Sequence, residues 1–143
     1  MTDDTIHLLK ECDSGTKTAV NSIRQVLDSV KDPQLLSLLS DSLKAHEAIG
    51  DELHSRLSEL GEKGKDPSGA ARISAWAKIN LSLLGDDSDK TVASLMTDGC
   101  NMGVKQLRIY KNKYPTADKD AQKTAEKLIQ EETTLCEKLR QYL

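Results

Sequence analysis

Three segments of this chain carry apolar side chains at alternating steps of three and four residues. This is the spacing of a helix face that packs along another helix. The three stripes are Ile6, Leu9, Asp13, Thr16, Val20, Ile23, Leu27 and Val30; Leu36, Leu39, Leu43, His46, Gly50, Leu53, Leu57 and Leu60; and Ala121, Ala125, Leu128, Glu132, Leu135, Leu139 and Tyr142. Each stripe is apolar at its ends and polar or glycine in its middle. We therefore expect long helices, packed nearly parallel or antiparallel, with a polar layer at mid-length.

The composition also favours an all-α domain. Aromatic residues make up only 3% of the 143 residues and phenylalanine is absent, so Leu, Ile, Val and Ala must build the core. A chain of this length forms one domain that buries roughly two thirds of its unfolded surface. We expect a single domain over residues 1–143. The leucines expected in its core are Leu39, Leu43, Leu53, Leu57, Leu128, Leu135 and Leu139.

Prolines, glycines and aspartates divide the chain into five predicted helices, over 3–30, 33–60, 70–84, 89–113 and 117–142. Pro33 after Asp32 predicts a helix start, and Gly61 predicts a helix end. Two tight turns predict two antiparallel hairpins, and residues 61–88 predict one long crossover that carries the extra short helix. Counted outward from the turns, Asp13 falls opposite Gly50 and Glu132 falls opposite Gly99. An up-down-up-down bundle is the alternative, but it needs no such crossover.

Several function classes are disfavoured by charge and hydropathy. The formal net charge is −3, with acidic and basic residues interspersed, and there is one tryptophan and three tyrosines. A nucleic-acid binder is expected to carry a basic patch or a set of stacking aromatics, and this sequence shows neither. We therefore do not predict nucleic-acid binding. No stretch approaches the roughly 20 apolar residues that span a bilayer. The acidic start of the chain lacks the apolar core of a signal peptide, so we expect a cytoplasmic protein.

The three cysteines, Cys12, Cys100 and Cys136, are odd in number and widely spaced, without a Cys-x-x-Cys motif. This pattern is typical of free thiols in a reducing cytosol. Cys100 has no neighbouring histidine or basic cluster in the sequence, which argues against a catalytic nucleophile.

Two stretches in the middle of the predicted helices resemble the ferritin-like superfamily, in particular its small bacterial members with a rubrerythrin-like bundle. They are Leu43-Lys44-Ala45-His46-Glu47 and Asp98-Gly99-Cys100-Asn101-Met102-Gly103. The resemblance implies an antiparallel four-helix bundle with one long crossover. It also implies a two-iron site built from a Glu on each of two helices and Glu-x-x-His on the other two. This sequence contains no Glu-x-x-His, and its nearest match is the Asp-x-x-His of residues 51–54.

Four side chains form the candidate polar layer: Asp13, His46, Asp98 and Glu132. A buried carboxylate must be paired or must shift its pKa until it is neutral. One interpretation is structural, with these groups paired to one another, to Thr16 or to water, and fixing the helix register. The other is a metal site. The predicted stripe of residues 89–113 is ambiguous, because Val92 and Met96 or Leu95 and Asp98 could face inward.

Two hypotheses for function follow from these observations. The first is a non-enzymatic binding or structural protein that acts on a second copy of itself or on a protein partner. The second is a metal-binding or redox protein with a non-standard carboxylate–histidine site that takes iron or manganese. The degenerate ligand motifs favour the first, so we assign no catalytic residue and predict no cofactor.

Overall fold

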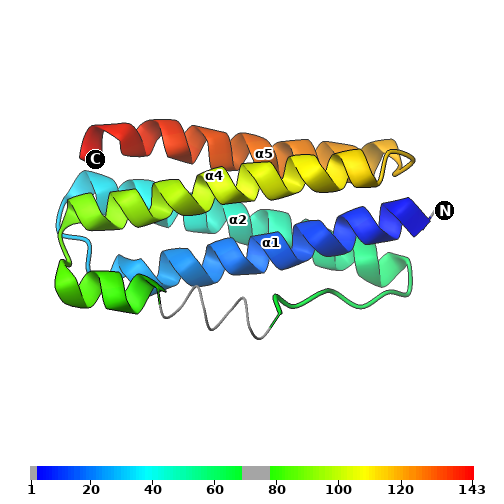
Figure 1. Ribbon diagram of the computed structural model, residues 1–143. Helices are drawn as coiled ribbons and strands as arrows, with labels where there is room; N and C mark the ends of the chain where they lie inside the picture. Colours follow the sequence, from blue (N-terminus) through cyan, green and yellow to red (C-terminus); the bar gives the residue numbers. More distant parts are fainter. Residues whose placement is uncertain (1–2, 69–77) are drawn as a thin grey trace.

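The computed structural model describes residues 3–68 and 78–143, which are helical apart from their connections (Figure 1). The long helices are α1 (Asp3–Leu27), α2 (Pro33–Glu59), α4 (Asp89–Lys113) and α5 (Lys119–Leu139), and a short 3-10 turn, η1 (Arg140–Tyr142), follows α5. Residues 78–85 form a further short helix. The all-α class is confirmed. Helix α4 has the predicted range, whereas α1 ends at Leu27 instead of residue 30 and α5 begins at Lys119 instead of residue 117. The predicted helix over 70–84 lies partly outside the described residues, and Trp76 lies entirely outside them.

The helix ends are set by side chains that satisfy the free backbone N–H groups of the first turn. Asp32, Ser88 and Asp118 accept these hydrogen bonds at the starts of α2, α4 and α5. A cap of this kind contributes about 1 kcal/mol to helix stability. Pro33 occupies the first position of α2, where its missing N–H costs nothing. Helix α2 ends at Glu59, and Gly61, just beyond the capping Leu60, has a φ of 69° that glycine readily adopts.

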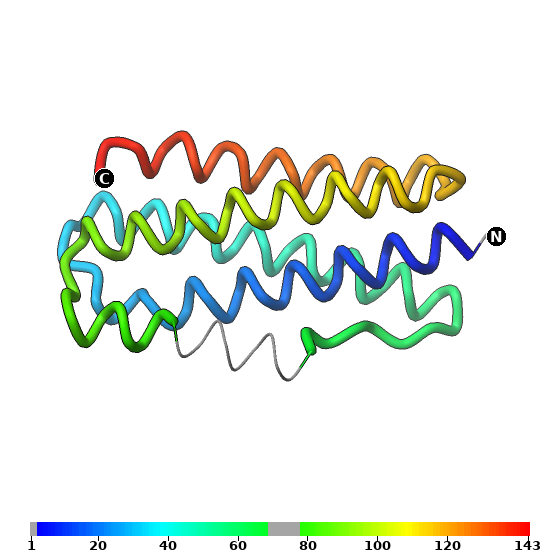
Figure 2. Tube along the Cα trace, viewed as in Figure 1, coloured from blue at the N-terminus to red at the C-terminus, as the bar shows by residue number. Residues whose placement is uncertain are grey.

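The four long helices form two antiparallel hairpins, α1 with α2 and α4 with α5. Figure 2 shows α1 and α5 running in one direction and α2 and α4 in the other. Helices α1 and α5 each pack on both α2 and α4, and they also touch each other across the centre of the bundle. Helix α2 ends at the end of the bundle opposite to the start of α4, so the connection must return along the bundle's length (Figure 1). This is a four-helix bundle with one long crossover.

The core consists of two apolar clusters, one toward each end of the bundle. Leu53, Leu57 and Leu128 belong to one cluster, and Leu35 and Leu139 belong to the other. Buried polar side chains lie between the clusters, at the level that the sequence stripes predict. These side chains are Asp13, Thr16, Ser42, His46 and Glu132. A polar layer at mid-length thus separates the two apolar clusters, and one further buried polar side chain, Thr5, lies at the start of α1.

Most of the predicted core leucines are buried, with one exception. Leu43 is only half-buried at the edge of a cluster. The stripe of α2 also begins one residue earlier than predicted, because Leu35 is buried and Leu36 is exposed. The helix turns by about 100° per residue, so a one-residue shift moves the side chain from the interior to the flank.

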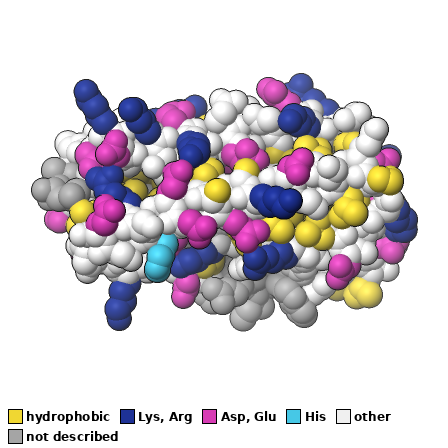
Figure 3. All heavy atoms as spheres, turned by 180° about the vertical axis from the view of Figure 1, so that it is seen from behind, with side chains coloured by type: hydrophobic (Ala, Val, Ile, Leu, Met, Phe, Trp, Pro, Cys, Tyr) yellow, Lys and Arg dark blue, Asp and Glu magenta, His cyan; other side chains and the backbone are white. Residues whose placement is uncertain are grey.

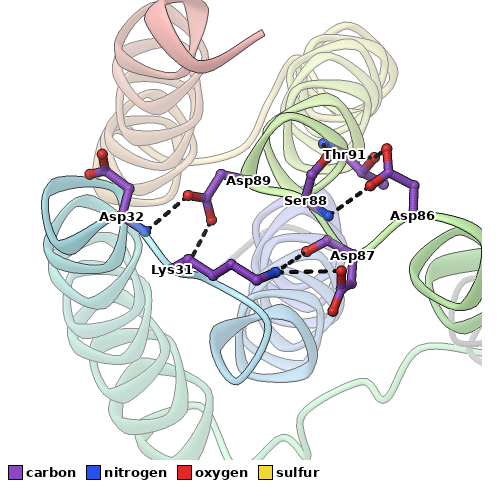
Figure 4. Close-up of polar contacts among 7 residues, drawn as sticks. All are labelled: Lys31, Asp32, Asp86, Asp87, Ser88, Asp89 and Thr91. Carbon is purple, nitrogen blue, oxygen red and sulfur yellow. Dashed lines mark hydrogen bonds and ion pairs between the residues drawn. The ribbon is translucent and has the colours of Figure 1, made fainter.

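At one end of the bundle, the N-terminus of α4 holds the turn between α1 and α2. The Asp89 carboxylate accepts hydrogen bonds from the backbone N–H groups of Lys31, at 2.8 Å, and Asp32, at 2.9 Å (Figure 4). The Lys31 ammonium also donates to the Asp87 carbonyl oxygen, at 3.0 Å. The two hairpins are thus joined through backbone groups as well as through packing.

At the other end, the start of α1 holds the turn between α4 and α5. Asp4 Oδ2 accepts from the backbone N–H of Thr116, at 3.0 Å, and from its hydroxyl, at 2.6 Å. The Thr5 hydroxyl accepts from the Asp118 N–H, at 2.8 Å. The hairpins are therefore fixed against each other at both ends.

The surface carries acidic and basic side chains interspersed, as the view from behind in Figure 3 shows. Several of them form pairs between helices, such as Arg24 with Glu47 and Lys127 with Glu52. Exposed pairs of this kind contribute at most about 1 kcal/mol each. None of the described helices is both long and apolar enough to cross a membrane.

The core assignment predicts a large loss of stability for Leu53→Ala. Leu53 is 0% exposed inside the first apolar cluster, so the substitution should lower the free energy of unfolding by about 2–5 kcal/mol. Leu84→Ala is the matched control, because Leu84 is 84% exposed and should change that free energy by less than about 0.5 kcal/mol. Urea denaturation measures both. Similar losses in the two variants would contradict the assignment.

Candidate functional site

A histidine and a glutamate form the centre of the polar layer and connect the two hairpins. His46, on α2, is 0% exposed, and Glu132, on α5, is 6% exposed. His46 Nε2 lies 2.5 Å from Glu132 Oε1. Both residues were predicted as candidate site residues, and the structure brings this pair into direct contact. The separation is that of a short, charge-assisted hydrogen bond.

The second ring nitrogen of His46 is also engaged. Nδ1 lies 2.8 Å from the Ser42 carbonyl oxygen, which can only accept, so Nδ1 carries a hydrogen. The Ser42 hydroxyl in turn donates to Glu131 Oε1, at 3.0 Å. The imidazole is therefore fixed on both sides. Ser42 and Glu131 were not predicted from the sequence, although Ser42 lies one helical turn before His46 and Glu131 is next to Glu132.

The protonation of His46 follows from two opposing effects. Burial lowers the pKa of His46, but the hydrogen bond to Glu132 and its negative charge, with smaller contributions from the Ser42 carbonyl and Glu131, raise it. The raising contributions are larger together, so the pKa of His46 lies above its ordinary value. An imidazolium that donates from both nitrogens, with Glu132 as a carboxylate, accounts for these contacts.

Asp13 is buried at the level of the polar layer, but its contacts are not with the His46–Glu132 pair. Its Oδ2 accepts a hydrogen bond from the Lys65 backbone N–H, at 2.9 Å, and forms an ion pair with Lys17 Nζ, at 2.8 Å. A Cβ at Gly64 would overlap the Asp13 carboxylate, so a larger residue there would displace this carboxylate from its present position. The predicted position opposite Gly50 is taken by Thr16, whose methyl carbon lies 3.5 Å from the site of a Cβ there. Asp13 thus attaches the loop to α1.

Asp98 lies outside the layer, which corrects the predicted four-residue set. Its side chain is 63% exposed, and its carboxylate is 3.7 Å from the Lys78 ammonium. Helix α4 presents the other of its two sequence stripes to the core, since Val92 and Met96 are buried. Within residues 3–68 and 78–143, no group of three or more His, Cys, Asp and Glu side chains is placed to hold a metal ion. The predicted ligand set therefore reduces to His46 and Glu132.

Glu132 faces Gly103, one turn along α4 from the predicted Gly99. A Cβ at Gly103 would lie 3.2 Å from Glu132 Oε2, which is closer than ordinary contact. The Cys100 thiol is a further neighbour: burial, the Glu132 charge and a hydrogen bond to Glu132 raise its pKa. Burial, with the charges of Glu11 and Asp13, raises the pKa of Cys12 to about 12. These thiols are thereby disfavoured as thiolates.

A groove of about 910 Å³ runs between α1 and α4, and the pair lies at its floor. The α1 wall consists of small side chains: Ser14, Gly15, Thr18, Ala19 and Ser22. The α4 wall includes Met96, Gly99, Met102 and Gly103. Within residues 3–68 and 78–143, nothing lies within 4 Å of where a Cβ at Gly15 or at Gly99 would be. This groove was not predicted from the sequence. The run of small residues on one face of α1 could have indicated it.

Comparison with solved structures finds the same fold elsewhere. The chain is similar to the crystal structure of a conserved hypothetical protein, rv2844, from Mycobacterium tuberculosis, with a TM-score of 0.76 and 15% sequence identity. The similarity covers 100% of this chain and 99% of that one. At this identity the similarity shows the fold alone. No protein-family model matches the sequence, and no curated protein matches it significantly.

The His46–Glu132 pair predicts a pH dependence of stability. Because the pKa of His46 is raised in the folded state, its contribution should be complete below the ordinary histidine value of 6.5. It should be lost as the pH rises through the raised folded value. Glu132→Gln removes the charge that raises this pKa while burial remains, so the His46 pKa should fall and this pH dependence should shrink.

Urea denaturation from acidic to alkaline pH, together with NMR titration of the His46 ring, measures both effects. Lys127→Gln is a matched control, because it removes an exposed charge from α5 without touching the pair. An unchanged His46 titration in Glu132→Gln would contradict the ion pair.

The two glycines of α4 at mid-bundle predict different effects of alanine on stability. Gly99→Ala should raise the free energy of unfolding by about 1 kcal/mol, because it adds helix propensity and its Cβ meets no atom of the described residues within 4 Å. Gly103→Ala gains the same propensity, but its Cβ presses on Glu132 Oε2. Its net gain should therefore be smaller, or negative. Thermal and urea unfolding of both variants measure the difference, and equal gains would show that Glu132 does not occupy this position.

Proposed function

We propose that this protein is a ferritin-like helical bundle that acts by binding and not by catalysis. We further propose that its ligand is a small, mainly apolar molecule in the groove between α1 and α4. The ferritin-like assignment is supported by the connectivity: two antiparallel hairpins joined by one connection that returns along the bundle, which is typical of such folds.

Binding is favoured over catalysis by the state of the reactive side chains. Both ring nitrogens of His46 are engaged, at 2.5 and 2.8 Å, so neither is free to move a proton at a substrate. Burial and the neighbouring Glu132 raise the pKa of the Cys100 thiol, which disfavours the nucleophilic thiolate. The polar side chains at the groove's floor are therefore suited to fixing the positions of the helices around the groove, and not to reacting with a substrate.

The alternative, a metal-binding or redox protein, has less support. His46 would have to give up Glu132 to bind a metal through Nε2, because that nitrogen lies 2.5 Å from the carboxylate. Asp13 and Asp98, the other predicted ligands, contact Lys17 and Lys78. We therefore retain the groove as the functional site.

The observation that carries the proposal is the open space over the groove's glycines. A glycine inside a helix costs roughly 1 kcal/mol relative to alanine, and a tight helix contact is the usual reason to accept that cost. Here a Cβ at Gly15 or Gly99 would touch nothing within 4 Å among the described residues, so packing between the described helices does not require either glycine. What their lack of side chains does provide is volume in a groove of about 910 Å³, within the size range of small-molecule sites.

Gly99→Leu tests the proposal by filling the groove. The uncharged dye Nile red should bind the wild-type protein, and its affinity should be about tenfold weaker in Gly99→Leu, because the leucine occupies the dye's volume. Ser94→Leu is the matched control: it places the same side chain on the same helix at an exposed position outside the groove. Fluorescence titration and NMR shifts of the groove residues measure binding.

Two results would contradict the proposal. One is equal dye affinity in the wild type and in Gly99→Leu. The other is a dimer in sedimentation experiments that Gly99→Leu disrupts, since the groove would then be filled by a second copy of the chain.

A further inference from the structure

We propose that Cys100 and Cys136 are a redox-sensitive pair, which hydrogen peroxide joins into a reversible disulfide between α4 and α5. The two cysteines come from the two helices of one hairpin, and both pack into the apolar cluster that contains Leu35 and Leu139. This modification site is separate from the binding function proposed above and does not depend on it.

The register of the α4–α5 hairpin places the two cysteines at one level. A Cβ at Gly103 would lie 3.7 Å from Glu132 Cγ, so these two positions face each other. Cys100 lies about one helical turn before Gly103, and Cys136 lies about one turn after Glu132. Because α4 and α5 are antiparallel (Figure 2), both steps lead toward the same end of the bundle. The cysteines therefore occupy neighbouring positions on adjacent helices.

Side-chain contacts agree with this register. Cys136 Sγ donates to Asn101 Oδ1, at 3.5 Å, and Asn101 directly follows Cys100. A negative charge on Cys136 is also one of the causes that raise the pKa of Cys100, an effect that falls off with distance. Disulfides join Cα atoms about 4–7 Å apart. We expect the pair to meet this requirement, because Gly103, one turn away, lets the two helices approach closely.

The two thiols differ in access. Cys136 is only partly buried, whereas Cys100 is 3% exposed, so peroxide should reach Cys136 first. Burial, the charge of Glu132 and a hydrogen bond to Glu132 raise the pKa of Cys100 and keep it protonated. An accessible cysteine beside a second cysteine that can resolve it is the usual arrangement of a redox sensor.

The oxidation takes place in two steps. The Cys136 sulfur attacks one oxygen of hydrogen peroxide and gives up two electrons; the O–O bond breaks, and a sulfenic acid and one water are formed. The Cys100 sulfur then attacks the sulfenic sulfur, so that the S–S bond forms and the S–O bond breaks. Glu132 accepts the hydrogen of the Cys100 thiol and can pass this proton to the leaving hydroxide, which departs as a second water.

Cys12 provides an internal comparison. It is 0% exposed in the other apolar cluster, away from the two remaining cysteines. It should therefore stay reduced and unlabelled as long as the protein is folded. Alkylation of Cys12 then reports how often the bundle opens.

Peroxide treatment of the folded protein, followed by alkylation and mass spectrometry without reduction, tests the proposal. We expect the loss of two hydrogen atoms and a linked peptide pair that contains Cys100 and Cys136, while Cys12 is alkylated only after denaturation. Dithiothreitol should reverse the change. Because the bond closes a loop within the α4–α5 hairpin, the oxidised protein should also unfold at a higher urea concentration than the reduced protein.

Two serine variants locate the effect. Cys136→Ser should abolish the shift in urea concentration, and Cys12→Ser is the matched control that should retain it. The mass spectrometry of the wild-type protein needs no substitution, so it decides the matter even if a variant does not fold.

Three results would overturn the proposal. The first is a Cys136 that stays reduced or ends as a sulfinic acid while Cys100 remains a thiol. The second is a disulfide that joins two copies of the chain. The third is a Cys100–Cys136 bond that forms no faster than Cys12 is alkylated in a parallel sample, since the bond would then require an opened bundle.

Discussion

The hydrogen bond between His46 and Glu132 is the contact on which the rest of the bundle depends. It joins α2 to α5, and therefore one hairpin to the other, at the level where apolar packing is interrupted. Loss of one partner would leave an uncompensated buried charge, which costs about 3–5 kcal/mol in comparable sites. Because the pair compensates its own charge, the apolar clusters on either side can close around it. The floor of the groove is a consequence of the same pair.

The periodicity of the sequence predicted which positions recur along the buried face of a helix. The stripe of α5 places Glu132 among buried residues, and the stripe of α2 does the same for His46. The start of α2 follows from Asp32 and Pro33, whose effects are local and readable in the sequence. The start of α5 was predicted at residue 117, but α5 begins at Lys119, after the capping Asp118. This local information was sufficient to predict the all-α class.

Other features depend on distances between helices that no stripe records. One of the two partners of Asp13 is the backbone N–H of Lys65, 52 residues away in a loop, and periodicity carries no information about that approach. Helix α4 has two plausible stripes, and packing alone determines that Val92 and Met96 face inward while Asp98 faces solvent. Counting from the turns placed Glu132 opposite Gly99, whereas its carboxylate lies against Gly103, one helical turn away. Counting backbone positions does not include the direction in which a long side chain extends. The groove was missed because it consists of absent side chains, which a search for apolar residues does not count.

The joints at the two ends of the bundle have a consequence for anything held between α1 and α4. These helices belong to different hairpins, and Asp89 at one end and Asp4 at the other fix their spacing through backbone N–H groups. The groove therefore has its width before a ligand arrives, and little conformational entropy is lost on binding. Since it exists only when the hairpins are assembled, occupancy shifts the equilibrium toward the assembled state. A molecule bound at mid-bundle would in this way slow the separation of the contacts at the two ends of the bundle, although it does not touch them.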